Sequence, residues 1–183
     1  MRLFVAVAVP DRLARVLQAA APADPGLRVL PPENLHVTVH FLGTVDPDRV
    51  TALTGALAAA CAGLEPFDLV FEAVVPAPKR QPRMLWARAA PSRRHTALAD
   101  AVAEAAAEAA PRARPPRTSA PHVTLARARG RGEGVRWPPA VALAGATLHV
   151  QECGLVRSEP GPDGSRYTVL ARLPLGDQPE RRR

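Results

Sequence analysis

Hydrophobic and polar positions along the chain predict a succession of strands and helices. Short apolar or β-branched runs that end at proline or glycine predict strands, whereas apolar residues that recur every three or four positions predict helices. By these criteria strands are expected at 3–9, 35–42, 67–75, 83–90, 122–128, 141–150, 152–158 and 166–173. Helices are expected to begin at Asp11, Asp46 and Ser92, which are residue types that favour a helix N-terminus. The expected fold class is therefore α+β.

The order of these elements repeats within the chain. A strand, a helix that begins after proline, a proline-rich loop and a strand with a His-x-Thr motif occur in the first half and return in the second. The prolines before the two helices, Pro10 and Pro91, are 81 positions apart, and the motif histidines, His36 and His122, are 86 apart. Offsets this similar predict two related lobes in one chain, although no obvious helix follows the second motif.

Composition and charge narrow the class of protein. The 183 residues fit one domain or one compact pair of lobes. No apolar run reaches membrane-spanning length and no signal-peptide pattern is present, so we expect a cytoplasmic protein in which Cys61 and Cys153 are free buried thiols. The net charge of +7 favours polyanion partners, although a single lysine, Lys79, among many arginines also fits a compositional bias.

Strand alternation divides the two His-x-Thr segments into a polar and an apolar face. The polar faces carry His36, Thr38 and His40 in the first segment and His122 and Thr124 in the second. The apolar faces, which are expected to point into the core, carry Val37, Val39, Phe41, Val123 and Leu125. If a pseudo-two-fold axis relates the lobes, the polar faces meet in one cleft that contains two imidazoles and two hydroxyls.

This set of groups suits phosphoryl chemistry without a metal. Imidazole can donate or accept a proton near neutral pH, and hydroxyls can donate hydrogen bonds to phosphate oxygens. A zinc pair of His36 and His40 is the alternative, but four residues of a strand span about 13 Å, too far for one ion. His40 is therefore expected to line the cleft or to be exposed, and His95 and His149 are expected to be surface or structural residues.

Arginines near the second motif are candidates for contacts with phosphate. Arg127 lies five residues after His122, and a guanidinium there is suited to binding a phosphate. Strict alternation places it on the opposite face from His122, so a bulge or a strand end is needed. Looser candidates for contacts with an RNA backbone, for which solvated surface charge is the alternative, are Arg80, Arg83, Arg117 and Arg129.

The motifs and their flanks resemble the two-histidine (2H) phosphoesterases, specifically the RNA 2',3'-cyclic phosphodiesterases formerly described as 2'-5' RNA ligases. The stretches that carry the resemblance are 3–7, 32–43, 85–86 and 121–127, together with Ser158 and Tyr167. The resemblance implies two pseudo-symmetric lobes, each an antiparallel sheet flanked by helices, with the active cleft between them. It also implies a single bilobal domain over 1–175, followed by a disordered basic tail at 176–183.

The resemblance further implies a reaction and roles for the motif residues. The expected reaction is metal-independent hydrolysis of 2',3'-cyclic phosphate ends of RNA to 2'-phosphates, with no cofactor and in a monomer. His36 is expected to be the proton donor and His122 the proton acceptor. Thr38, Thr124 and Arg127 are expected to bind the phosphate, and Phe41 is an alternative component of the cleft wall. Two other functions stay open, namely reversible 2'-5' ligation or cleavage of RNA, and RNA binding without catalysis.

Overall fold

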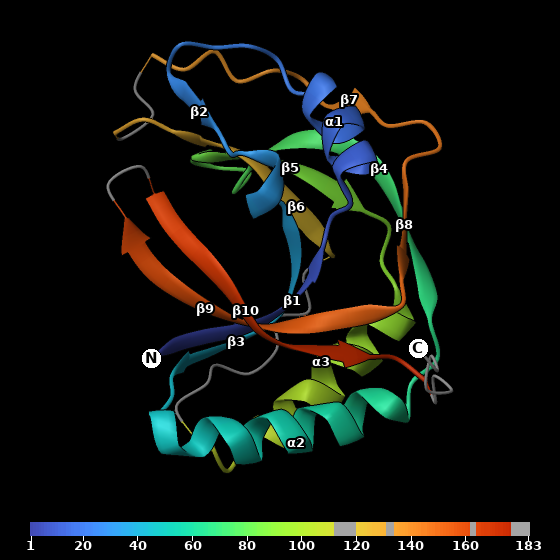
Figure 1. Ribbon diagram of the computed structural model, residues 1–183. Coiled ribbons are helices and arrows are strands. Elements are labelled where there is room, and N and C mark those ends of the chain that lie inside the picture. Colours follow the sequence, from blue (N-terminus) through green and yellow to red (C-terminus); the bar gives the residue numbers. More distant parts are fainter. Residues whose placement is uncertain (112–119, 131–133, 162–163, 177–183) are drawn as a thin grey trace.

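The computed structural model describes residues 1–111, 120–130, 134–161 and 164–176 and confirms the α+β class (Figure 1). Arg117 and the tail residues 177–183 lie outside the described residues, so the predictions for them, and the domain boundary at 175, stay predictions. No helix in the described ranges is long and apolar enough to cross a membrane.

Ten strands of the described residues form one antiparallel sheet. Its main path runs through β10 (Gly164–Pro174), β9 (Glu152–Gly161), β1 (Arg2–Ala8), β3 (His36–Thr44), β6 (His122–Ala128), β5 (Met84–Ala89), β4 (Phe67–Ala77) and β7 (Val141–Ala142). Two short strands lie off this path, with β2 (Leu27–Val29) paired to β6 and β8 (Thr147–Val150) paired to β4.

The sheet consists of two halves that meet where β3 lies beside β6. The first half contains β10, β9, β1 and β3, and the second contains β6, β5, β4 and β7. The pairing of β3 with β6 contains one pair of residues, Val37 opposite Val123. The repeat predicted from the sequence is present, because β1–α1–β3 and β5–α3–β6 are each an antiparallel strand pair with a helix between the strands in the chain.

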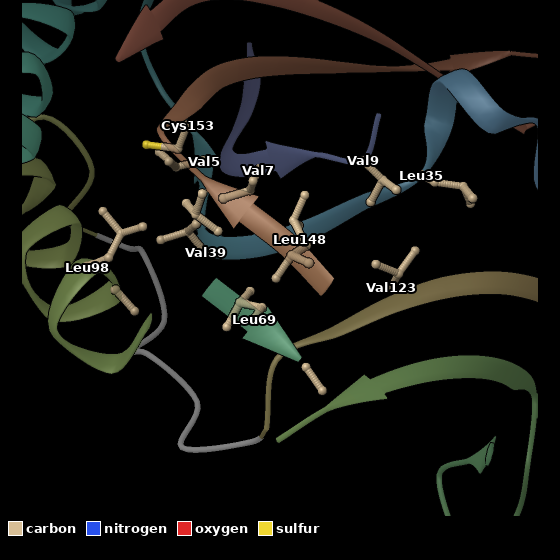
Figure 2. Close-up of a cluster of buried hydrophobic side chains, with 14 of the residues drawn as sticks. Val5, Val7, Val9, Leu35, Val39, Leu69, Leu98, Val123, Leu148 and Cys153 are labelled. Carbon is tan, nitrogen blue, oxygen red and sulfur yellow. The ribbon is translucent and has the colours of Figure 1, made fainter. Parts of the chain in front are cut away.

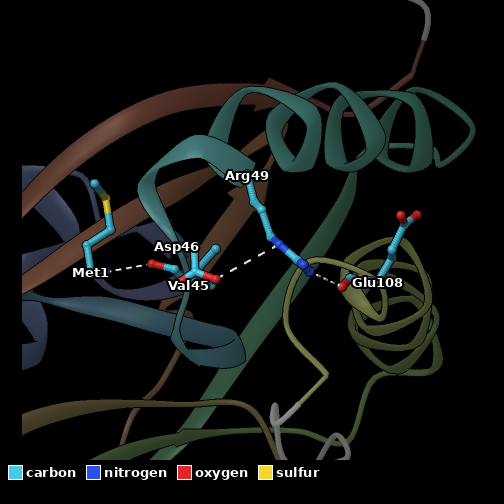
Figure 3. Close-up of polar contacts among 5 residues, drawn as sticks. All are labelled: Met1, Val45, Asp46, Arg49 and Glu108. Carbon is cyan, nitrogen blue, oxygen red and sulfur yellow. Dashed lines mark hydrogen bonds and ion pairs between the residues drawn. The ribbon is translucent and has the colours of Figure 1, made fainter.

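The described residues form three helices beside the sheet, namely α1 (Asp11–Ala19), α2 (Val50–Ala62) and α3 (Arg93–Ala106), with short 3-10 turns at Pro32–Asn34 and Pro47–Arg49. α2 and α3 pack on each other, with α2 against β10 and α3 against β3, whereas α1 contacts the 3-10 turn at Pro32–Asn34 (Figure 1). Ser92 caps α3 as expected, since its Oγ accepts a hydrogen bond from the backbone N–H of His95 at 3.2 Å. At the start of α2, Arg49 donates to the carbonyl of Glu108 at 3.0 Å and thereby joins α2 to the end of α3 (Figure 3).

One apolar core runs through both halves. Val39 of β3, Leu98 of α3 and Leu69 of β4 belong to the same buried cluster (Figure 2). Cys61 of α2 and Cys153 of β9 are free and buried in it, as predicted, with their sulfurs 3.6 Å apart. The hydrogen bond with the Cys61 sulfur, together with burial, raises the pKa of the Cys153 thiol, so that this thiol stays protonated.

Two predictions about elements were incomplete. The proline-rich connection at 22–32 contains β2, whose three residues are too few to give a pattern. The single strand expected at 141–150 is two strands, because Gly145 adopts a positive φ of 72° and turns the chain between them. β2 matters for the site because it pairs with the strand that carries the second motif.

Candidate active site

The two His-x-Thr motifs lie on neighbouring antiparallel strands in the middle of the sheet. Val37 and Val123, where β3 and β6 pair, are fully buried. Side chains alternate along a strand, so the residues on either side of these valines project from the opposite face, which we call the cleft face. In this register His36 lies across from Thr124, and Thr38 lies across from His122. The structure thus brings together the four motif residues that were predicted from the sequence.

Both histidine rings are oriented by the same backbone contact. Nδ1 of His36 lies 2.7 Å from the carbonyl oxygen of Asn34, and Nδ1 of His122 lies 3.2 Å from that of Ala120. A carbonyl only accepts, so each Nδ1 carries the hydrogen and donates it. Nε2 is then the ring atom of each histidine that is left to exchange a proton.

Aromatic side chains enclose the ring of His36. Its centroid lies 5.1 Å from that of Phe4 and 5.2 Å from that of Tyr167, which meets the imidazole edge-on at 86°. This burial lowers the pKa of His36 below its ordinary value of 6.5, and the positive charge of Arg127 lowers it further, while the Asn34 carbonyl acts in the opposite direction. His36 is therefore neutral in the unliganded protein at neutral pH.

The ring of His122 has a different neighbour. It stacks on the indole of Trp86 with centroids 3.7 Å apart and planes inclined by 19°. Burial lowers the pKa of His122 as well, against the effect of the Ala120 carbonyl. A neutral imidazole with a free Nε2 is the form that a general base requires.

A β-bulge in each motif strand interrupts the alternation of faces. In β3, Val5 pairs with His40 but the next residue of β1 pairs with Thr38, so Val39 is the extra residue. In β6, Ala126 and Thr124 are the consecutive partners, so Leu125 is the extra residue. A bulge moves every later side chain to the other face. The two copies of the motif therefore share not only their sequence but also the same break in the strand.

The bulges decide the place of three predicted residues. Arg127 projects from the cleft face, as the role in phosphate binding requires, because the bulge at Leu125 removes the objection from alternation. The placement of His40 on the cleft face was wrong, since it is 5% exposed in the core. Of the two placements given for Phe41, the core was wrong; it is 63% exposed on the cleft face, in agreement with the alternative that the resemblance implied, and its ring lies 6.0 Å from that of Phe4. His36 and His40 therefore lie on opposite faces of β3.

A pocket of about 280 Å³ lies beside His36, which two of its lining residues contact, Asn34 and Tyr167. It is lined by Arg28, Val29, Leu30, Pro31, Asn34, Arg127, Pro160, Gly161, Gly164, Ser165 and Tyr167. Arg28 was missed from the sequence, since it stands in a proline-rich loop without a periodic pattern. Its position shortly before the first His-x-Thr motif could have indicated that it lies near the site. That it lies directly opposite Arg127 is shown by the pairing of β2 with β6.

The remaining histidines and arginines do not line the pocket. His95 is buried at the start of α3, so the surface alternative was wrong for it. It lies behind the motif strands: burial lowers its pKa, a hydrogen bond with the backbone of Thr38 acts in the opposite direction, and the nearby His122 lowers the pKa further. His149 is exposed as predicted and lies 2.6 Å from a carboxylate oxygen of Asp68. The looser candidates that the structure describes are exposed and do not line the pocket: Arg80, Arg83 and Arg129.

The chain is similar to known proteins in both sequence and fold. The family described as LigT like Phosphoesterase matches residues 3–86. An RNA 2',3'-cyclic phosphodiesterase of Thermus thermophilus is 32% identical over 184 residues, which cover 96% of this chain and 90% of the relative. One of Methanothermobacter thermautotrophicus is 26% identical over 180 residues, which cover 93% of this chain and 96% of the relative.

A solved structure agrees along the whole chain. The crystal structure of TT0787 of Thermus thermophilus has a TM-score of 0.83 and 28% identity, over 97% of this chain and 100% of that chain. The fold, the paired motifs and the relatives of similar length thus all indicate the same family. The chain belongs to the LigT-like phosphoesterases, the two-histidine family that its motifs led us to expect.

Proposed function

We propose that the chain is an RNA 2',3'-cyclic phosphodiesterase that leaves a 2'-phosphate. The observation that carries the proposal is the matched pair of histidines on β3 and β6, each with Nδ1 held by a carbonyl and Nε2 left for proton exchange. The names of the similar proteins from Thermus and Methanothermobacter support the same activity. The substrate is an RNA or oligonucleotide that ends in a cyclic phosphate. The cytoplasmic location and the monomeric state stay predictions.

The reaction needs one proton to be removed and one to be supplied. Nε2 of His122 takes a proton from a water molecule, whose oxygen attacks phosphorus. The bond from phosphorus to the 3'-oxygen breaks, and Nε2–H of His36 gives that oxygen a proton. The product carries a 2'-phosphate and a free 3'-hydroxyl, and exchange with solvent returns both imidazoles to their starting forms.

The remaining cleft residues act on the charge of the phosphate. Thr38 lies across from His122, and Thr124 lies across from His36. Both threonines donate hydrogen bonds to the non-bridging oxygens. Arg127 binds the phosphate on the side of His36. Burial, and to a lesser extent the positive charge of Arg127, lower the pKa of His36 in the free protein. The bound anion offsets the charge of Arg127 and raises the pKa of His36, so His36 gains its proton in the complex.

The test uses purified protein, an oligonucleotide that ends in a 2',3'-cyclic phosphate, and buffer containing EDTA. We expect turnover to a 2'-phosphate end, identified by resistance of that end to an enzyme specific for 3'-phosphates. Absence of turnover would leave RNA binding without catalysis as the function, and a 3'-phosphate product would reverse the assignment of His36 and His122. Loss of activity on chelation would contradict the metal-independent reaction.

A second assay separates hydrolysis from ligation. An oligonucleotide with a free 5'-hydroxyl is added to the same reaction, because this hydroxyl can replace water as the group that attacks phosphorus. We expect hydrolysis to predominate at every concentration of acceptor tested. A 2'-5' linked product in excess of the hydrolysed one would instead identify the chain as an RNA ligase.

A further inference from the structure

The pocket beside His36, which we call the arginine pocket, has the chemistry of an anion site. It lies between the loop of β2 and the hairpin of β9 and β10, so that both halves of the sheet contribute to it. Arg28 and Arg127 supply two positive charges, and none of its described lining residues is acidic. Such a pocket favours a ligand with at least one negative charge.

The two arginines are held close together by the backbone. They are direct partners in the antiparallel register of β2 and β6, so their side chains leave the same face. Two guanidinium groups on the same face of neighbouring strands can donate hydrogen bonds to one anion together. Arg28 also reaches across the pocket, because its Nη1 lies 2.9 Å from the place that a Cβ on Gly164 would take.

The arginine pocket adjoins the His36 side of the cleft. Two of its lining residues contact His36 directly, since Asn34 provides the carbonyl that holds Nδ1 and Tyr167 packs on the ring at 5.2 Å. His36 faces the 3'-oxygen in the reaction proposed above. In a ribose the 3'-carbon is bonded to the 4'-carbon, which leads to the 5'-oxygen. The 5'-phosphate of the terminal nucleotide therefore lies on the same side as His36.

We propose that the arginine pocket binds the phosphodiester on the 5' side of the terminal nucleotide, with Arg28 as its specificity-determining residue. The proposal rests on the proposed function, because it assumes that the cyclic phosphate lies between His36 and His122. It names the substrate more closely: an oligonucleotide end is preferred over a cyclic mononucleotide, which has no phosphate to place beside Arg28.

The experiment compares two substrates with the same terminal nucleoside, a nucleoside 2',3'-cyclic phosphate and the dinucleotide that carries one further phosphodiester on its 5' side. kcat/KM is measured for the wild type, for Arg28→Gln and for Arg166→Gln. Arg166 is a matched control, since it is exposed on the same hairpin, opposite Glu159, and does not line the pocket. Both variants lose one positive charge.

We expect the wild type and Arg166→Gln to prefer the dinucleotide by about tenfold or more, the size of one charge-assisted hydrogen bond. Arg28→Gln is expected to lose this preference and to keep its kcat/KM for the mononucleotide, which also shows that it is folded. In the wild type the dependence of log kcat/KM on log salt is expected to be steeper for the dinucleotide, because salt screens one further pair of opposite charges, and Arg28→Gln loses that difference.

The other outcomes overturn the pocket proposal, either alone or together with the proposed function. Equal kcat/KM of the wild type on both substrates overturns the pocket proposal and leaves the proposed function intact. An equal loss on both substrates in Arg28→Gln overturns it too, because Arg28 would then act on the cyclic phosphate or on the fold. A loss of preference in Arg166→Gln would replace the pocket with a general effect of charge. Absence of turnover on either substrate overturns both proposals.

Discussion

The two halves of the sheet provide nearly the same backbone around two different histidines. In each half a motif histidine is held by the carbonyl two residues before it, and in each the strand bulges one residue after the motif threonine. The side chains opposite the threonines differ, since Ala6 pairs with Thr38 but Trp86 pairs with Thr124. Phe41 and Arg127, five residues after their histidines, also differ.

This difference identifies the residues that can give the two histidines different roles in the proposed reaction. The tetrapeptides and their geometry are the same, so they cannot by themselves make one histidine an acid and the other a base. Small Ala6 leaves the ring of His36 to be enclosed by Phe4 and Tyr167, whereas the indole of Trp86 covers the face of His122. The neighbours of each ring, rather than the motif, distinguish the two halves.

The largest expected effect comes from removing either histidine. His36→Ala and His122→Ala should each lower kcat by about 10²–10⁴-fold, because each removes one proton transfer. The double variant should be little worse than either single one, since the two groups act in one step. Turnover of a cyclic-phosphate oligonucleotide measures this, and His149→Ala, an exposed histidine, is the control. Substantial activity in one of the two single variants would mean that the histidine it lacks is not required for the reaction.

The bulge residues offer a comparison of stability. Leu125 is completely buried and Val39 is 6% exposed, so both leave a cavity when they are shortened. Leu125→Ala should lower the free energy of unfolding by about 2–5 kcal/mol. Val39→Ala should lower it by about 1.6 kcal/mol, for two methyl groups at 0.8 kcal/mol each. Urea unfolding measures both, and a loss below about 1 kcal/mol for Leu125→Ala would show that the bulge is not anchored by packing.

Arg127 marks the sharpest chemical difference between the halves. Arg127→Gln should lower kcat/KM by about tenfold to a hundredfold, because it removes a charge-assisted hydrogen bond to the phosphate. Phe41→Gln, at the equivalent position, should change kcat/KM less. If the two substitutions had equal effects, the chemical asymmetry of the cleft would have to lie elsewhere.

The smallest expected effect is on the pH dependence. In the proposed reaction His36 is the acid and must be protonated, so activity falls as pH rises through its pKa. His122 is the proposed base and must be neutral, so activity falls as pH drops through its own pKa. Burial lowers the pKa of both below 6.5 in the free protein, so the maximum of kcat/KM should lie below that pH. The bound phosphate raises the pKa of His36, so kcat should have its maximum at higher pH.

Arg127→Gln provides the check on this assignment. It removes a positive charge that lowers the pKa of His36, so the limb on which kcat/KM falls with rising pH should move to higher pH. The other limb, which reports His122, should stay in place. Movement of both limbs, or of the His122 limb alone, would contradict the assignment of acid and base.

Much of the fold, and the part of the site that the two His-x-Thr motifs form, could be predicted from the sequence. Apolar periodicity located β1, β3, β6 and the three helices, because each buries one face against the core. The alternation of His36, Thr38, His122 and Thr124 with buried residues was enough to place them on one face. The repeat also indicated that the two strands belong to related units.

The rest depends on contacts between distant segments. A bulge is set by the register of the partner strand, so alternation within β3 alone placed His40 and Phe41 on the wrong faces. Arg28 enters the site through a three-residue strand that forms only because β6 offers a free edge. Trp86 and Tyr167 approach the histidines from other strands, and no spacing in the sequence specifies which ring each one meets.

The pairing of Val37 with Val123 has a consequence for the choice of bond. The pseudo-two-fold axis passes through this pair, so a rotated ligand would meet the same two imidazoles and the same two hydroxyls. Regiochemistry is then not a property of the catalytic groups, which could open the ring on either side. It is set by whatever fixes the direction in which the nucleotide enters. In the proposed reaction, the residues around the cleft that differ between the two halves therefore determine which bond to phosphorus breaks.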